Sequence, residues 1–192
     1  MILASSLRLG FTPRRKAAKK TMSITRETDK SLRDHLLSLL RGGNAHIKFE
    51  DFVADFPAQL CGKKVESLPY TAWQVLEHMR IAQWDILEFC RDARHISPKW
   101  PEGYWPKPNE VGNATLWNET VGKFRAALKQ MEELISNSST DLFAKITHGD
   151  GQTILREALL VADHNSYHLG VLVAIGRMLQ DLADVERLEA QK

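Results

Sequence analysis

Apolar side chains recur at helical spacing in four long segments, and this pattern constrains the fold of the chain more than any other feature. In the clearest segment, 116–135, the intervals between apolar residues alternate between four and three: Trp117, Val121, Phe124, Leu128, Met131 and Ile135. A stripe of this kind lies on one face of an α-helix and is typical of helices that pack in a bundle. No segment shows the convincing alternation that indicates a strand.

The same spacing predicts long helices over about 30–41, over about 71–94 and from 153 to 179 or beyond, and a short one over 49–56. Gly42 and Gly43 end the first of these helices, and Thr71 with Gln74 forms a capping-box pattern at the start of the second. The sequence therefore predicts an all-α protein, a four-helix bundle. The connection between the second and third long helices, about 95–114, is rich in Pro, Trp and Tyr. Its length permits a crossover, so simple up-down-up-down order is not required.

Composition and charge narrow the class of protein. At 192 residues the chain is the size of one domain. No uninterrupted apolar run approaches the roughly 18 residues that span a bilayer, so we expect no membrane segment. Cys61 and Cys90 have 28 residues between them and do not suggest a disulfide framework. A reduced, cytoplasmic location is the simplest interpretation.

The basic character of the chain belongs to its N-terminal segment. Residues 1–21 carry six Lys and Arg residues and no acid, so the remainder of the chain has a net charge of −4 against +2 for the whole. This remainder offers no basic face for nucleic acid. The segment could be a transit-like sequence, an arm that binds nucleic acid or membrane, or an extension ahead of a start at Met22. We expect a disordered extension over 1–28, a bundle domain over 29–182 and a tail over 183–192.

Three of the seven histidines fall on apolar faces of the predicted helices. His164 and His168 are four residues apart, so they project from the same side of one helix, and His78 lies early in another. A buried imidazole without a partner costs about 1–3 kcal/mol, and one metal ion would satisfy all three. Two interpretations stay open at this point: a metal site of three histidines, and core histidines held by ordinary hydrogen bonds.

The residues around these histidines resemble the DinB/YfiT-like family of metal-dependent enzymes. The resemblance lies in Glu77-His78 within 71–91 (TAWQVLEHMRIAQWDILEFCR) and in Asp163-His164-x-x-x-His168 within 156–172 (REALLVADHNSYHLGVL), and it extends over about 29–182. It implies a four-helix bundle in up-down-down-up order with the long crossover between helices two and three. It also implies homodimers and one zinc or nickel ion on His78, His164 and His168. The better-understood relatives use a low-molecular-weight thiol, as S-transferases or as a thiol-dependent isomerase.

Three neutral imidazoles leave an ion with about its full +2 charge and an open coordination position. Imidazole suits zinc, nickel, copper and iron, so the sequence does not select the metal. A thiol or a water molecule bound at the open position would lose its proton more readily. The sequence therefore predicts an enzyme that activates a small thiol, with a hydrolase or a non-catalytic metal-binding scaffold as alternatives.

Two carboxylates and three aromatic residues are candidates for the surroundings of the ion. Asp85 and Glu157 each lie two turns from one of the histidines, where they could accept an imidazole N–H or act as a general base. Trp100, Tyr104 and Trp105 in the crossover could roof a substrate pocket, or they could simply pin the loop against the bundle.

Overall fold

The computed structural model describes residues 25–189, and within this range it contains seven helical elements and no strand. They are α1 (Arg26–Arg41), α2 (Phe49–Asp55), the 3₁₀ helix η1 (Ala58–Leu60), α3 (Ala72–Arg91), the 3₁₀ helix η2 (Glu102–Tyr104), α4 (Ala114–Ser136) and α5 (Ile154–Glu189). Lys145 and Thr153 form an isolated β-bridge ahead of α5. The prediction of an all-α protein is confirmed.

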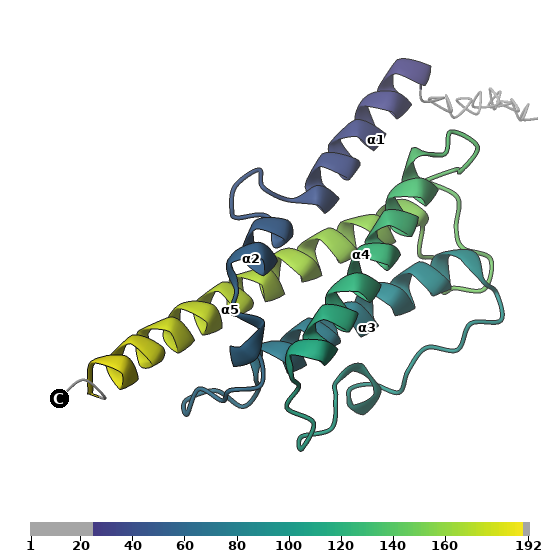
Figure 1. Ribbon diagram of the computed structural model, residues 1–192. Coiled ribbons are helices and arrows are strands. Elements are labelled where there is room, and N and C mark those ends of the chain that lie inside the picture. Colours follow the sequence, from purple (N-terminus) through teal and green to yellow (C-terminus); the bar gives the residue numbers. More distant parts are fainter. Residues whose placement is uncertain (1–24, 190–192) are drawn as a thin grey trace, which may run out of the picture.

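The long helices lie side by side (Figure 1). α3 packs against both α4 and α5, and α1 packs against the same two helices. In Figure 1, α3 and α4 run in one direction, whereas α1 and α5 run in the other. Because α3 and α4 are parallel, the chain must return along the molecule between them, and residues 92–113 make this return. The long connection noted in the sequence is therefore a crossover.

The ends of the helices follow from local capping, with two differences from the sequence prediction. α3 begins with a complete capping box, in which Thr71 and Gln74 each bond to the other's main-chain N–H, as the sequence predicted. α1 begins at Arg26, ahead of the predicted domain start at 29, because the Thr25 side chain accepts a bond from the Thr28 N–H. α5 continues to Glu189, well past the predicted end of the domain at 182. Residues 1–24, which include most of the predicted extension, lie outside the described part of the chain.

The core is built from the predicted apolar stripes. In α4 five of the six stripe residues are buried, and Leu128 is partly buried. At one end of the core, aromatic rings of α2 and of the residue after it pack on α4: the Phe49 and Phe124 centroids lie 4.4 Å apart, and those of Phe56 and Trp117 lie 4.6 Å apart. At the other end, Leu36 and Leu40 of α1 join a second apolar cluster with residues of α3, α4 and α5. Both clusters include residues of α3 and α5, which fixes how these two helices face each other.

A buried arginine fastens α1 to the end of α4. Arg33 is 7% exposed, and its Nη1 donates to the carbonyl oxygens of Ile135 (2.6 Å) and Asn137 (3.0 Å). Its Nη2 donates to Thr140 O at 2.7 Å, and Asp29 one turn earlier neutralises the charge. The guanidinium thus pairs a carbonyl group in the last turn of α4, that of Ile135, and two more in the chain that follows the helix.

One described helix would pass as a membrane span by length and composition alone. This segment, Ile154–Ala183, has a mean hydropathy of 1.2 over its best window, of which 33% is buried. The buried residues of α5 contribute to both apolar clusters.

Candidate metal centre

The packing of α3 on α5 brings the imidazoles of His78, His164 and His168 to one point. Nε2 of His78 lies 3.1 Å from Nε2 of His164 and 3.2 Å from Nε2 of His168. One nitrogen from each ring lies within 4.8 Å of the other two, and His78 is only 3% exposed. The structure thus brings together the three histidines that the sequence singled out among seven.

These distances fit a shared ion. With zinc–nitrogen bonds of about 2.0–2.1 Å and tetrahedral geometry, two ligand nitrogens lie about 3.3 Å apart. The two closest pairs of Nε2 atoms here are 3.1 and 3.2 Å apart, so the rings need little adjustment to share one ion.

Hydrogen bonding alone satisfies the cluster poorly. His78 Nδ1 lies 2.8 Å from the carbonyl oxygen of Tyr104, which can only accept, so Nδ1 carries the proton. Nε2 of His78 then has one lone pair, and Nε2 of both other histidines approach it. One lone pair accepts one good hydrogen bond, whereas one cation can accept lone pairs from all three nitrogens. The donor set therefore favours a metal ion over a purely hydrogen-bonded core.

The three imidazoles are also neutral, which is the protonation state that can bind a metal ion. Burial is the main cause that lowers the pKa of His78. Burial, followed by repulsion from the neighbouring imidazoles, lowers the pKa of His164 and that of His168 to about 4. At neutral pH all three rings are uncharged, and a neutral imidazole is the form that binds a metal.

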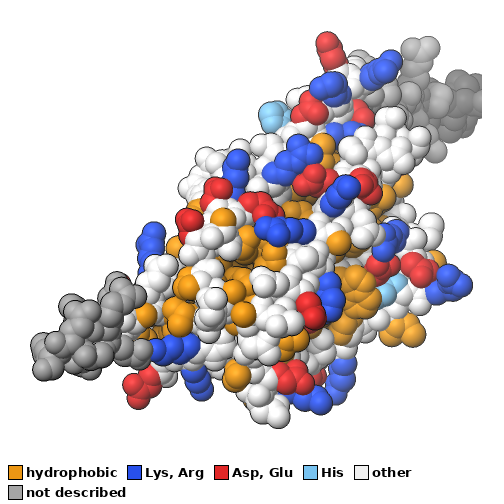
Figure 2. Space-filling view, viewed as in Figure 1, with side chains coloured by type: hydrophobic (Ala, Val, Ile, Leu, Met, Phe, Trp, Pro, Cys, Tyr) orange, Lys and Arg blue, Asp and Glu red, His pale blue; other side chains and the backbone are white. Residues whose placement is uncertain are grey.

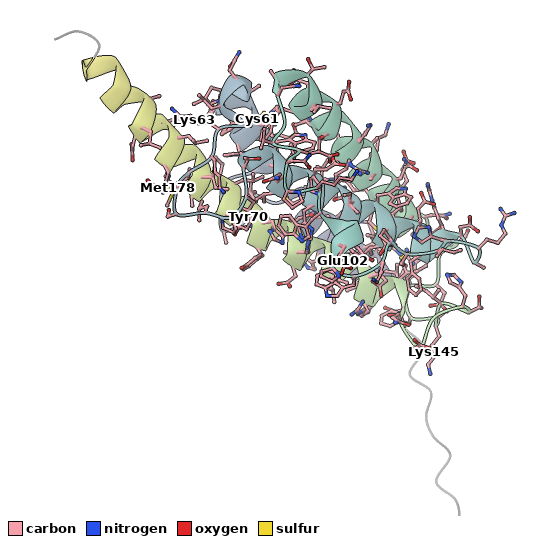
Figure 3. The ribbon with its side chains drawn as sticks, turned by 90° about the horizontal axis from the view of Figure 1, so that it is seen from below. Cys61, Lys63, Tyr70, Glu102, Lys145 and Met178 are labelled. Carbon is pink, nitrogen blue, oxygen red and sulfur yellow. The ribbon has the colours of Figure 1, made fainter. Side chains whose placement is uncertain are left out.

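The crossover connection covers His78 with an aromatic ring. The Trp105 indole stacks on the His78 imidazole, with centroids 4.0 Å apart and planes 3° apart. The Tyr70 ring in turn stacks on the Trp105 indole, with centroids 5.6 Å apart. Together with the Tyr104 carbonyl bond, this stack fixes the orientation of the His78 ring. Figure 3 looks onto this side of the molecule from below, with Tyr70 and Glu102 labelled.

A cavity of about 380 Å³ opens beside His78 and His164, within the range of small-molecule sites. Besides the two imidazoles, the cavity is lined by apolar side chains of α3 and α5, by aromatic side chains of the crossover and by polar side chains. The apolar ones are Ala82, Ile86, Phe89 and Leu160, the aromatic ones of the crossover are Trp100 and Tyr104, and the polar ones are Asp85, Gln152, Arg156 and Glu157. Two of the three predicted roof residues therefore line the cavity, while Trp105 lies against the imidazole. Trp100 is 69% exposed and rests edge-on against Tyr104.

Neither Asp85 nor Glu157 bonds to His78, His164 or His168 in the described part of the chain. Asp85 accepts from the Tyr104 hydroxyl at 2.6 Å and faces His95 Nε2 at 2.7 Å. The acceptor for His78 is instead the main-chain oxygen of Tyr104. Burial first, and then the bond to Asp85, raises the pKa of the Tyr104 hydroxyl to about 12. Asp85 therefore acts on the crossover, which it holds against α3 through two side chains.

Glu157 also bonds to a residue outside the histidine cluster, Arg156. It is 2% exposed, and both of its carboxylate oxygens accept from Arg156 Nη1, at 2.8 and 3.0 Å. His95 was not among the residues that the sequence singled out. Its bond to Asp85 depends on the path of the crossover, for which the local sequence gives no signal.

A second, larger cavity of about 600 Å³, whose lining includes none of the three histidines, lies between the end of α1, the start of α2, α3, α4 and α5. Its lining includes the apolar side chains of Met79, Phe124 and Leu128 and the ion-paired Arg41 and Glu132. Figure 2 shows apolar surface between charged side chains in the middle of this face. Asn165 lines this cavity, next in sequence to His164, which lines the smaller one.

Comparison of the chain with models of protein families, with curated proteins and with solved structures gave no match. Membership of the DinB/YfiT-like family is therefore a proposal.

Proposed function

We propose that this chain is a metal-dependent enzyme of the DinB/YfiT-like type, which binds one zinc or nickel ion through His78, His164 and His168 and activates a small thiol. The observation that carries the proposal is the convergence of three neutral Nε2 atoms at one point beside a cavity. The helix directions support the family, because α1 and α5 run opposite to α3 and α4, as an up-down-down-up four-helix bundle requires.

The number of ligands favours catalysis over a structural role. A structural zinc usually has four protein ligands, whereas a catalytic zinc has three and an open position. Among the described residues, no Cys, Asp or Glu joins the three histidines in the cluster. His78 and His164 also line the cavity of about 380 Å³, so a small molecule can reach the ligand atoms from that side.

An ion held by three neutral imidazoles would supply Lewis-acid chemistry and lower the pKa of a thiol in the open position. The chain's own residues orient the site and select what enters it. Trp105 and the Tyr104 carbonyl hold the His78 ring in place. The apolar side chains that line the cavity, Ala82, Ile86, Phe89 and Leu160, suit a substrate with an apolar body.

The engagement of the two carboxylates favours thiol chemistry over hydrolysis. A hydrolase needs a general base beside the attacking water. Asp85 is already bonded to Tyr104 and His95, and Glu157 to Arg156. A thiol whose pKa is lowered needs no such base at neutral pH.

Metal analysis of the purified protein tests the site first. We expect about one zinc or nickel ion per chain, lost when His78, His164 or His168 is replaced by Ala. His148→Ala is the matched control, because that imidazole bonds to the Phe89 carbonyl oxygen outside the cluster and should leave the metal content unchanged. Loss of metal in His148→Ala with retention in His78→Ala would overturn the ligand assignment.

The reaction is tested with the metallated protein, a panel of cellular thiols and 1-chloro-2,4-dinitrobenzene. Transfer forms a sulfur–carbon bond and releases chloride and a proton. We expect metal-dependent consumption of a thiol that His168→Ala abolishes. Turnover of ester or amide probes without a thiol, lost in Asp85→Asn, would indicate the hydrolase instead. No turnover of any kind by fully metallated protein would indicate a scaffold.

The oligomeric state and the cellular location are proposed together with the function. We propose a homodimer, on the family resemblance, and a cytoplasmic location, on the two cysteines, which form no disulfide. Sedimentation of the metallated protein tests the first, and fractionation of cells that express the full chain tests the second.

A further inference from the structure

The larger cavity, of about 600 Å³, has in its lining one charged side chain that lacks a partner. The other Asp, Glu and Arg side chains of the lining each form an ion pair: Asp34 with Lys30, Arg41 with Glu132, and Glu50 with Arg125. The ammonium group of Lys48 forms no ion pair or hydrogen bond among the described residues, 25–189. The unbalanced charge of this cavity is therefore the single positive charge of Lys48.

The loop after α1 supports this lysine at the edge of the cavity. Gly43 has a φ of +80°, and a Cβ atom added there would lie 2.6 Å from both Cγ and Cε of Lys48. The aliphatic part of the lysine thus lies directly over Gly43, where only glycine leaves room for it. Lys48 is exposed and also lines the cavity, so its ammonium group can meet a ligand at the opening and still contact water.

The uncharged part of the lining combines an apolar wall with polar side chains that already have partners. The wall takes apolar side chains from all five α-helices, and Figure 2 shows such side chains between charged ones on this face; among them are Leu40, Phe49, Met79, Phe124, Leu128 and Leu169. The polar side chains bond to one another or to a neighbour: Ser38 with Asn44, His46 with Ser166, and Asn165 with Gln83. The remaining oxygen of Asn165, Oδ1, is inaccessible to water. A ligand in this cavity would therefore meet apolar side chains and one free ammonium group.

We infer that this cavity binds a small amphipathic carboxylate, whose apolar body lies against the apolar wall and whose carboxylate pairs with Lys48. A volume of about 600 Å³ is within the range of small-molecule sites. One free ammonium group balances one negative charge, whereas a phosphate monoester carries about two. A cationic ligand would be repelled by Lys48, and so would residues 1–21, which carry six Lys and Arg residues and no acid. None of the three candidate metal ligands lines this cavity, so the site is independent of the proposed metal centre.

Displacement of an uncharged fluorophore, N-phenylnaphthylamine, from the full chain tests the charge of the ligand. The competitors are decanoate, decanol and decylamine, which share one apolar chain and differ in head group. Decanoate should bind about five- to tenfold more tightly than decanol, and decylamine should bind most weakly. Lys48→Glu should make decylamine the tightest of the three, whereas Lys64→Glu, at an exposed residue outside both cavities, should keep the wild-type order. An unchanged order in Lys48→Glu, or the same change in both variants, would overturn the inference.

The metal centre is the other place where a carboxylate could bind, and a further variant separates the two sites. Decanoate should displace the fluorophore from His168→Ala as readily as from the wild type, because His168 does not line the larger cavity. Binding that is lost in His168→Ala and kept in Lys48→Glu would place the carboxylate at the metal centre and overturn the inference. Failure of decanoate to displace the fluorophore from the wild type would also overturn it.

Carbon-13 NMR of the methionine methyl groups in the wild type locates the ligand directly. Met79 lines the larger cavity, whereas Met131 is fully buried and lines neither cavity. The rings of N-phenylnaphthylamine should shift the Met79 signal, assigned through Met79→Leu, and leave that of Met131 in place, and decanoate should reverse the shift. A Met79 signal that does not move would overturn the inference even if Lys48→Glu does not fold. Absence of metal binding by the wild type would refute the proposed function instead and would leave this result unaffected.

Discussion

Replacing Tyr104 with Phe would test how the crossover is held over the metal centre. The change removes one hydroxyl and keeps the aromatic ring, its contact with Trp100 and the main-chain oxygen that accepts from His78. The lost bond is the 2.6 Å contact to Asp85, a carboxylate that is only 7% exposed. A hydrogen bond to a charged group contributes about 1.5–3 kcal/mol. We therefore expect a loss of about 2 kcal/mol in the free energy of unfolding and a fall in melting temperature of about 4–8 °C.

Urea denaturation of wild type, Tyr104→Phe, Asp85→Asn and the double variant measures this interaction as a double-mutant cycle. The two changes should be non-additive, with a coupling of about 1–2 kcal/mol. Tyr70→Phe is the matched control, since the Tyr70 ring also stacks in this region and its hydroxyl makes no hydrogen bond among the described residues. A Tyr104→Phe variant as stable as Tyr70→Phe, or strictly additive changes, would refute the reasoning. Zinc affinity should fall less than tenfold, because the His78 partner is a main-chain atom.

Three further predictions concern the fold and the metal. Arg33→Met should lower the free energy of unfolding by about 3–5 kcal/mol in urea denaturation, because it leaves buried carbonyl oxygens unpaired; a loss below about 1 kcal/mol would contradict this. A chelator should lower the melting temperature of the metallated wild type, by mass action, and leave a variant without His78, His164 and His168 unchanged; equal shifts would show that the chelator acts elsewhere. A chain that begins at Met22 should keep its helicity by circular dichroism and its metal content, because residues 1–21 carry no periodic apolar face; loss of cooperative unfolding would contradict it.

The sequence predicted the helices well, because the signals for a helix lie within a few residues of each other. The stripe from Trp117 to Ile135 and the capping box of Thr71 and Gln74 both lie where the pattern placed them. The prediction missed the start of α1, which lacks an apolar signal. The first turn of α1 is polar and rests on the cap at Thr25.

The relation between two of the three candidate ligands could also be predicted from local sequence. His164 and His168 share a face of α5 because they are four residues apart, whatever the rest of the chain does. The meeting of His78 with this pair was a hypothesis, since it depends on how α3 and α5 are rotated and shifted against each other. Both apolar clusters contain residues of α3 and α5, and their packing sets that rotation.

The surroundings of the site came from the tertiary structure alone. The crossover has no periodic pattern, so nothing local indicated that the Tyr104 carbonyl would bond to His78 or that His95 would face Asp85. The bond between Asn165 and Gln83 likewise joins residues 82 positions apart. The sequence by itself determined which segments are helical and which histidines share a helix face, because those properties repeat along a single segment. Only the packed structure decided which polar atoms meet, because hydrogen bonds depend on fractions of an ångström between segments that approach each other only after folding.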